Sequence, residues 1–152
     1  MKRALILLFM SFALLDGFAQ DTLFTEVASK SDNVIKATVL DIGRKLRFED
    51  GMAHYTITCR VDESFKGGLK AADTIQIEIT EYTFTYGGRD SISASNSESF
   101  IYRGASFVFL LNKATPRLST AKYVYIPIDS ILGVLSPNDQ LLFYLRTNFK
   151  TK

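Results

Sequence analysis

Strict alternation of side chains over His54–Phe65 is the feature that most limits the fold of this chain. Polar residues separate the apolar ones, which are Tyr55, Ile57, Cys59, Val61 and Phe65. Successive side chains of a strand point to opposite faces, so this period of two predicts a half-buried antiparallel strand. His54 falls on the polar face, where we expect it to be solvated.

Other segments also favour strands. Thr74–Thr80 alternates, with Ile75, Ile77 and Ile79 facing inward, and the phase change at Tyr82 predicts a bulge or a strand end near Glu81. Phe107–Leu111 is apolar on both faces, as in a central strand. Further strands are predicted at Val34–Ile42, Tyr123–Ile126 and Leu141–Arg146.

Little of the chain favours helix. Asp21 or Thr22 is a candidate cap for a short helix that ends near Lys30, and Asp129–Leu135 is a candidate for one further turn. The predicted fold is therefore mainly all-β, a small barrel of five to six strands with a short N-terminal helix. A sandwich of the same strands stays open, because alternation does not distinguish a closed sheet from two packed sheets.

The first residues predict export. Lys2 and Arg3 precede the apolar run Ala4–Leu15, and small residues lie three and one positions before a cut after Ala19. This is the layout of a cleaved secretory signal peptide, and the run is shorter than the about 20 residues that a spanning helix needs. An uncleaved anchor or a buried core helix is the alternative. We expect residues 1–19 to be removed and the protein to lie in the periplasm or outside the cell, without a transmembrane segment.

The remaining chain, residues 20–152, fits one domain. Cleavage would remove two of the 18 basic and one of the 16 acidic residues, which leaves 16 and 15. This near-neutral balance argues against nucleic acid as a partner. Cys59 is the only cysteine, so no internal disulfide forms, and its place on the apolar face predicts a buried, inert thiol.

One segment of low complexity interrupts the strands. Residues 87–99 are rich in serine and glycine and predict an exposed, flexible loop. Large aromatic side chains alternate just before it, at Tyr82, Phe84 and Tyr86, and Arg89 and Asp90 lie within it. Because recognition often uses mobile loops on a rigid scaffold, we take these five residues as the candidate binding site. Completion of the barrel core is the other interpretation of the three aromatic residues.

No catalytic or metal-binding pattern is found in the sequence. His54 is the only histidine, and one histidine with one cysteine does not make a zinc site. Asp62 and Glu63 are adjacent carboxylates that we expect on opposite faces of a strand. We therefore expect a protein that is not an enzyme and that needs no cofactor.

Several short motifs together resemble the netrin-module and TIMP-like domains. They are Ser31-Asp32-Asn33-Val34-Ile35, Ala37-Thr38-Val39, Tyr55-x-Ile57, Val61-x-x-Ser64-Phe65-Lys66-Gly67, Ile75-x-Ile77 and Phe100-x-x-x-Gly104-x-x-Phe107-Val108-Phe109. The resemblance covers about residues 31–111 and implies an OB-type barrel with an extracellular binding role. The animal inhibitors of this family chelate a protease zinc through an N-terminal cysteine, whereas this chain would begin at Gln20 and also lacks the family's disulfides.

The sequence thus favours an exported, non-catalytic binding module, with another protein of the cell envelope or medium as the expected partner. A carbohydrate-binding module that uses Tyr82, Phe84 and Tyr86 is the alternative, because exposed aromatic residues on OB-type barrels bind extended sugars. A metalloprotease inhibitor that acts without an N-terminal cysteine is a third, weaker hypothesis.

Overall fold

The computed structural model describes residues 22–43, 46–47, 52–82, 92–93, 100–118, 120–128 and 133–149. The chain divides into two units, Met1–Lys30 and Ser31–Lys152. In the first unit, residues 22–30 form the predicted helix, on which Lys30 and Glu26 form an ion pair of 2.6 Å. The rest of this section concerns the second unit.

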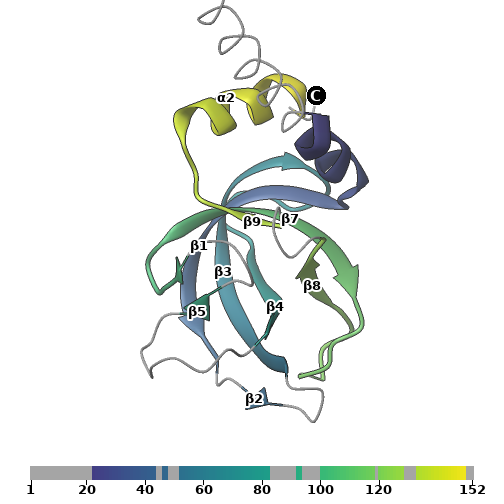
Figure 1. Cartoon of the computed structure of the whole chain (residues 1–152), viewed down its shortest axis with the longest axis vertical. Coiled ribbons are helices and arrows are strands. Elements are labelled where there is room, and N and C mark those ends of the chain that lie inside the picture. Colours follow the sequence, from purple (N-terminus) through teal and green to yellow (C-terminus); the bar gives the residue numbers. More distant parts are fainter. Residues whose placement is uncertain are drawn as a thin grey trace, which may run out of the picture. The chain divides into compact units, whose positions relative to one another are not determined.

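Five strands of the second unit close into a barrel, which confirms the predicted small all-β fold (Figure 1). Their order is β1-β3-β4-β8-β7, and β7 pairs back with β1. The β4–β8 contact is parallel, through Ile77 and Tyr125, and the other pairs in the barrel are antiparallel. The bounds are β1 Asn33–Ile42, β3 Met52–Lys66, β4 Thr74–Tyr82, β7 Ser106–Ala114 and β8 Val124–Pro127.

Short strands extend this barrel. Leu46–Arg47 (β2) pairs with β3, and Val134–Leu135 (β9) pairs with β7. Ile92–Ser93 (β5) and Phe100–Ile101 (β6) form a separate two-stranded sheet. β5 lies inside residues 87–99, which we predicted to be an exposed, flexible loop, and the rest of that segment lies outside the described residues. β9 occupies the last two residues of Asp129–Leu135, where we expected a helical turn, so that prediction is wrong at residues 134–135.

The alternating residues fill the barrel as the period of two predicts. On β3, Tyr55, Ile57 and Cys59 are fully buried. The other interior residues come from every barrel strand and from Ile101, Ala105 and Val134; they are Ile35, Ala37, Val39, Val61, Ile75, Ile77, Ile79, Phe107, Phe109, Leu111 and Tyr125. Val108 and Leu110 are also fully buried, which confirms that β7 is covered on both faces.

The predicted closing strand at Leu141–Arg146 is wrong, because these residues lie in the helix α2 (Asp139–Asn148). Asn138 caps this helix, with its side-chain oxygen accepting a hydrogen bond of 2.8 Å from the Leu141 backbone N–H. α2 lies against β3, where Arg146 donates two hydrogen bonds of 2.8 and 2.7 Å to Glu63. Its Leu145 is fully buried. The apolar run therefore has the spacing of a helix that buries one side.

Candidate functional site

The structure leaves the predicted binding residues largely untested. Tyr82 is the last residue of β4 and pairs with Met52, which agrees with the predicted strand end near Glu81. Phe84, Tyr86, Arg89 and Asp90 lie outside the described residues. We therefore searched the described surface for side chains that the fold brings together.

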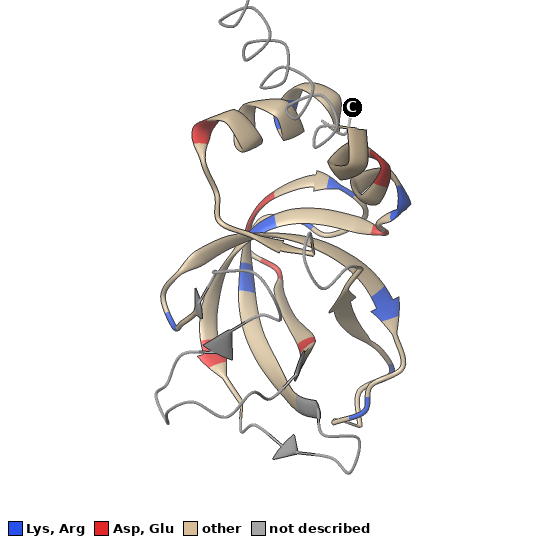
Figure 2. Ribbon diagram, viewed as in Figure 1, with Lys and Arg blue, Asp and Glu red and all other residues tan. Residues whose placement is uncertain are grey.

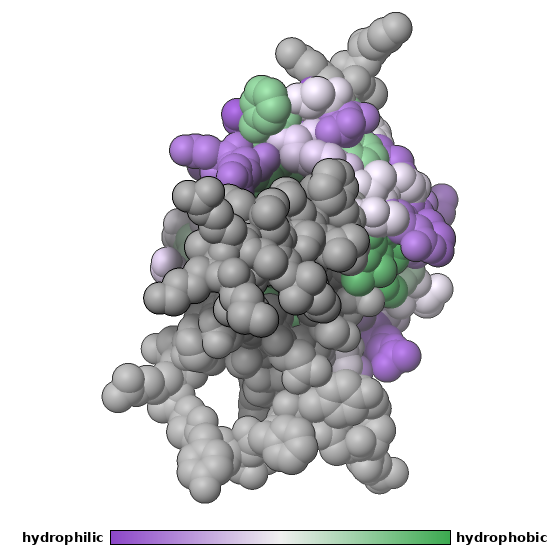
Figure 3. Space-filling model, turned by 45° about the horizontal axis from the view of Figure 1, so that its top comes forward, coloured by the Kyte–Doolittle hydropathy of each residue, from purple (hydrophilic) through white to green (hydrophobic). Residues whose placement is uncertain are grey.

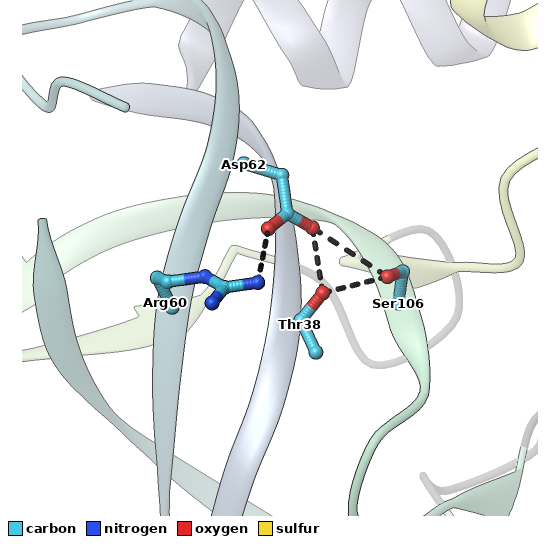
Figure 4. A network of polar contacts seen from close by, with 4 residues as sticks. All are labelled: Thr38, Arg60, Asp62 and Ser106. Carbon is cyan, nitrogen blue, oxygen red and sulfur yellow. Dashed lines mark hydrogen bonds and ion pairs between the residues drawn. The ribbon is translucent and has the colours of Figure 1, made fainter. Parts of the chain in front are cut away.

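A polar network lies where β3, β1 and β7 run side by side (Figure 4). Asp62 of β3 is at its centre. Its Oδ2 accepts a hydrogen bond of 2.7 Å from Thr38 Oγ1 of β1, and Thr38 Oγ1 lies 2.8 Å from Ser106 Oγ of β7. Arg60 Nη2 lies 3.6 Å from the other carboxylate oxygen. The network therefore spans three strands.

The hydrogen-bond directions follow from the number of protons. A hydroxyl has one proton to donate, and Thr38 uses it on the carboxylate of Asp62. Ser106 is therefore the donor in its contact with Thr38, which is shorter than its 3.5 Å contact with Asp62. This chain of bonds fixes both hydroxyls and leaves the Arg60 side chain 54% exposed.

A β-bulge accounts for the position of Asp62. Lys36 pairs with Glu63 but the next residue, Ala37, pairs with Val61, so Asp62 is the extra residue on β3. Asp62 binds Thr38 whereas Glu63 binds Arg146 of α2, so the two adjacent carboxylates do not form one site.

The turn that precedes β7 extends the network along β1. Gly104 donates a backbone hydrogen bond of 2.8 Å to Val39, and Val39 donates one of 2.9 Å to Ala105. The positive φ of 85° at Gly104 suits glycine in this turn. Arg103, from the same turn, forms an ion pair with Asp41 at the end of β1. The turn is thereby held beside β1.

These two groups of contacts lie along β1, and we call the residues there the β1 surface. Leu40 and Tyr102 add large side chains to it, with exposed fractions of 40% and 56%. Its members are Thr38, Leu40, Asp41, Arg60, Asp62, Tyr102, Arg103 and Ser106. These residues come from three segments that are far apart in the sequence, and the pairing of β1 with both β3 and β7 brings the segments together.

The β1 surface offers hydrogen bonds and charge but no activated nucleophile. Ser106 donates to Thr38 and contacts no histidine in the described part of the chain. His54, expected to be solvated, is in fact 3% exposed, and its Nδ1 lies 2.9 Å from Thr80 Oγ1 of the neighbouring strand. Cross-strand pairing of His54 with Thr80 explains this contact.

Among the described residues, neither the charged side chains nor the side chains that could bind a metal gather in one place. Lysines and arginines are interspersed with aspartates and glutamates along the described ribbons (Figure 2). Hydrophobic residues form separate small areas between hydrophilic ones on the described surface in Figure 3. Among the described residues, no three His, Cys, Asp or Glu side chains form a metal-binding group. None of the helices described there is long and apolar enough to span a membrane.

Cys59 is buried inside the barrel, as predicted. Burial, with a smaller contribution from the charge of Asp62, raises the pKa of this thiol from 9.0 to about 12. At pH 8 only about one thiol in 10,000 would therefore be ionised. The unfolded chain would release this proton near pH 9.0 and the folded chain near pH 12, so the thiol stabilises the fold below pH 9.0 and loses that effect as the pH rises towards 12.

We expect Cys59 to resist a disulfide-exchange reagent at pH 8 in the folded protein and to react within minutes in concentrated urea. The measurement is the absorbance of the released chromophore with time, and the denatured protein is the control for total thiol. Rapid reaction of the native protein would contradict the burial of this side chain.

The strand order, with one parallel contact and closure through β1 and β7, defines the class of the protein as a small OB-like barrel. No protein-family model matches the chain, and no curated protein matches it either.

Proposed function

We propose that the protein is an exported, non-catalytic binding module that recognises another protein through the β1 surface. The observation that carries this proposal is that exposed Arg60 lies beside a fixed polar network and that exposed Arg103, next to exposed Tyr102 in the sequence, is held by Asp41. Arginine and tyrosine are enriched among the residues that dominate binding energy at protein interfaces.

The geometry supports binding because the surface is organised before a partner arrives. Asp62 fixes Thr38 and Ser106 through hydrogen bonds, and Asp41 holds Arg103. A partner would thus order few side chains, which lowers the entropic cost of association. Each guanidinium has five N–H donors, so Arg60 retains donors for carboxylates or backbone carbonyls of the partner.

Export and family membership belong to the same proposal. The pattern of Lys2, Arg3 and the apolar run before Ala19 supports secretion. The OB-like barrel supports the resemblance to netrin-module and TIMP-like domains at the level of the fold. In an envelope or extracellular setting, a barrel that presents the charged and hydrogen-bonding groups of the β1 surface suits the role of an interaction module.

The test is co-purification of tagged mature protein from envelope and medium fractions, followed by quantitative mass spectrometry. We expect one enriched partner that decreases by about tenfold or more with the double substitution Arg60→Glu and Arg103→Glu. The matched control, Lys70→Glu with Lys122→Glu, reverses two exposed cations outside the β1 surface and should retain the partner.

A third variant separates the β1 surface from the segment that the sequence favoured. If deletion of residues 87–99 abolishes the partner while Arg60→Glu with Arg103→Glu retains it, the β1 surface is not the binding site. If no protein is enriched with any variant or with the wild type, the proposed protein-binding function is wrong.

A further inference from the structure

A second group of polar and aromatic side chains lies at one end of the barrel. Lys113 follows interior Leu111 by two residues on β7, and Tyr123, just before β8, precedes interior Tyr125 by two residues. Asp73 likewise precedes interior Ile75 by two residues. With a period of two, these side chains continue the inward-facing rows beyond the core.

The two tyrosines form an aromatic corner at this barrel end. Their rings meet edge to face at 86°, with centroids 5.7 Å apart. Tyr125 is 6% exposed and therefore fixed, whereas Tyr123 is 46% exposed. Lys113 pairs with Tyr125 across the strands, and its Nζ lies 4.8 Å from the centroid of the Tyr123 ring. Tyr123 is thus held by two neighbours, with Lys113 over one face of its ring, and still remains partly exposed.

Two carboxylates at this barrel end accept backbone hydrogen bonds, Asp32 just before β1 and Asp73 just before β4. Asp32 Oδ2 accepts a bond of 3.0 Å from the Lys113 N–H, and the Asp32 N–H donates one of 2.9 Å to Asn112. Asp73 Oδ2 accepts a bond of 2.8 Å from the Lys70 N–H. Each carboxylate has about four lone-pair sites, so these bonds leave acceptors for a ligand.

The hydroxyl of Tyr125 complements these acceptors. Burial raises the pKa of Tyr125, and the neighbouring Tyr123, Asp73 and Asp32 raise it further. The hydrogen bond between the side chains of Tyr125 and Tyr123 is one of these causes, so the two phenols interact directly at this barrel end. The barrel end thus combines an accessible aromatic ring, a neutral donor, two fixed acceptors and an ammonium group.

We propose that this barrel end, formed by Asp32, Asp73, Lys113, Tyr123 and Tyr125, binds one unit of a neutral saccharide. The C–H groups of a sugar ring would pack against the exposed part of the Tyr123 ring, on the side that Lys113 leaves open. Its hydroxyls would donate to Asp32 and Asp73. This site is independent of the proposed protein-binding surface, and it uses none of the aromatic residues that the sequence singled out.

The charged groups at this barrel end disfavour anionic ligands and apolar ligands. Two carboxylates disfavour phosphate and sulfate groups, which excludes nucleic acid and sulfated glycans as the preferred ligand. An apolar ligand would leave the desolvated carboxylates unpaired. A neutral polyol satisfies donors and acceptors of both kinds without a net charge.

The test is titration of ¹⁵N-labelled mature protein with maltohexaose, cellohexaose, chitohexaose and mannohexaose, followed by amide chemical shifts. We expect at least one of these sugars to shift the amides of Asp32, Asp73, Lys113 and Tyr123 in a saturable manner, up to about 10 mM ligand. Tyr123→Ala should weaken the affinity by about tenfold or more, while Tyr123→Phe should retain most of it.

Tyr102→Ala is the matched control, because it removes an exposed tyrosine from the β1 surface. The proposal is overturned if none of the four sugars produces a saturable shift, or if Tyr102→Ala weakens binding as much as Tyr123→Ala. The two proposals fail separately: Tyr123→Ala should retain the co-purified protein partner, and Arg60→Glu with Arg103→Glu should retain the sugar.

Discussion

Gly67→Ala is expected to lower the free energy of unfolding by about 3 kcal/mol. Gly67 follows β3 with φ of +99°, in the left-handed region, where a side chain costs about 1–2 kcal/mol. An added Cβ would also lie 2.2 Å from Asn33 Oδ1 and 2.5 Å from the Asp32 carbonyl oxygen. The first residues of β1 would therefore have to move.

Gly68→Ala provides the matched control, because a Cβ there meets nothing within 4 Å and its φ is not in the left-handed region. We expect this change to alter stability by about 0.5 kcal/mol or less. Urea denaturation of both variants, with unchanged m-values, measures the difference. Equal midpoints for the two variants would contradict the close approach of Gly67 to the start of β1.

The strands could be predicted because the alternation of apolar and polar residues is a local property of the sequence. Ile75, Ile77 and Ile79 face the interior as their spacing requires, and β3 pairs with β4 from Met52–Tyr82 to Arg60–Thr74 without a register shift. The strand predicted at Leu141–Arg146 is wrong because a short apolar segment fits a strand or the buried side of a helix equally well. The cap at Asn138 was the signal for a helix, since its side chain binds the Leu141 N–H.

The β1 surface could not be predicted, because its residues meet only through the register of three strands. Thr38 faces Arg60 on one side and Ser106 on the other. The bulge that adds Asp62 to this row is a property of the pairing and has no distinct sequence signal. The group of residues at the barrel end could not be predicted for the same reason, because Lys113 lies beside Tyr125 only when β7 pairs with β8.

Burial of His54 shows a further limit of local patterns. Alternation assigned this residue to the polar face of β3, and that face is solvated at Arg60 but buried at His54. The period of two gives the side of a strand, whereas coverage of that side depends on distant segments. Glu78 illustrates the same point, because it lies on the outward row of β4 and is only 7% exposed.

Glu78→Ala is expected to lower the free energy of unfolding by about 2–3 kcal/mol. The carboxylate accepts hydrogen bonds from two backbone N–H groups of the β7–β8 connection, at 3.0 Å from Arg117 and 2.9 Å from Leu118. Alanine would leave both donors without this acceptor in a largely buried place. Gln76→Ala, an exposed position in the same row, is the control and should change stability by about 0.5 kcal/mol or less.

Amide hydrogen exchange locates the effect of Glu78→Ala more sharply than the global stability does. The N–H groups of Arg117 and Leu118 should exchange at least about tenfold faster, in excess of any change at the fully buried Ile77. Because the same connection leads to Tyr123, loss of this anchor should also weaken saccharide binding at the barrel end, whereas Gln76→Ala should not. Unchanged exchange at Arg117 and Leu118 would show that Glu78 does not hold the connection, and the position of Tyr123 would then depend on its contacts with Tyr125 and Lys113.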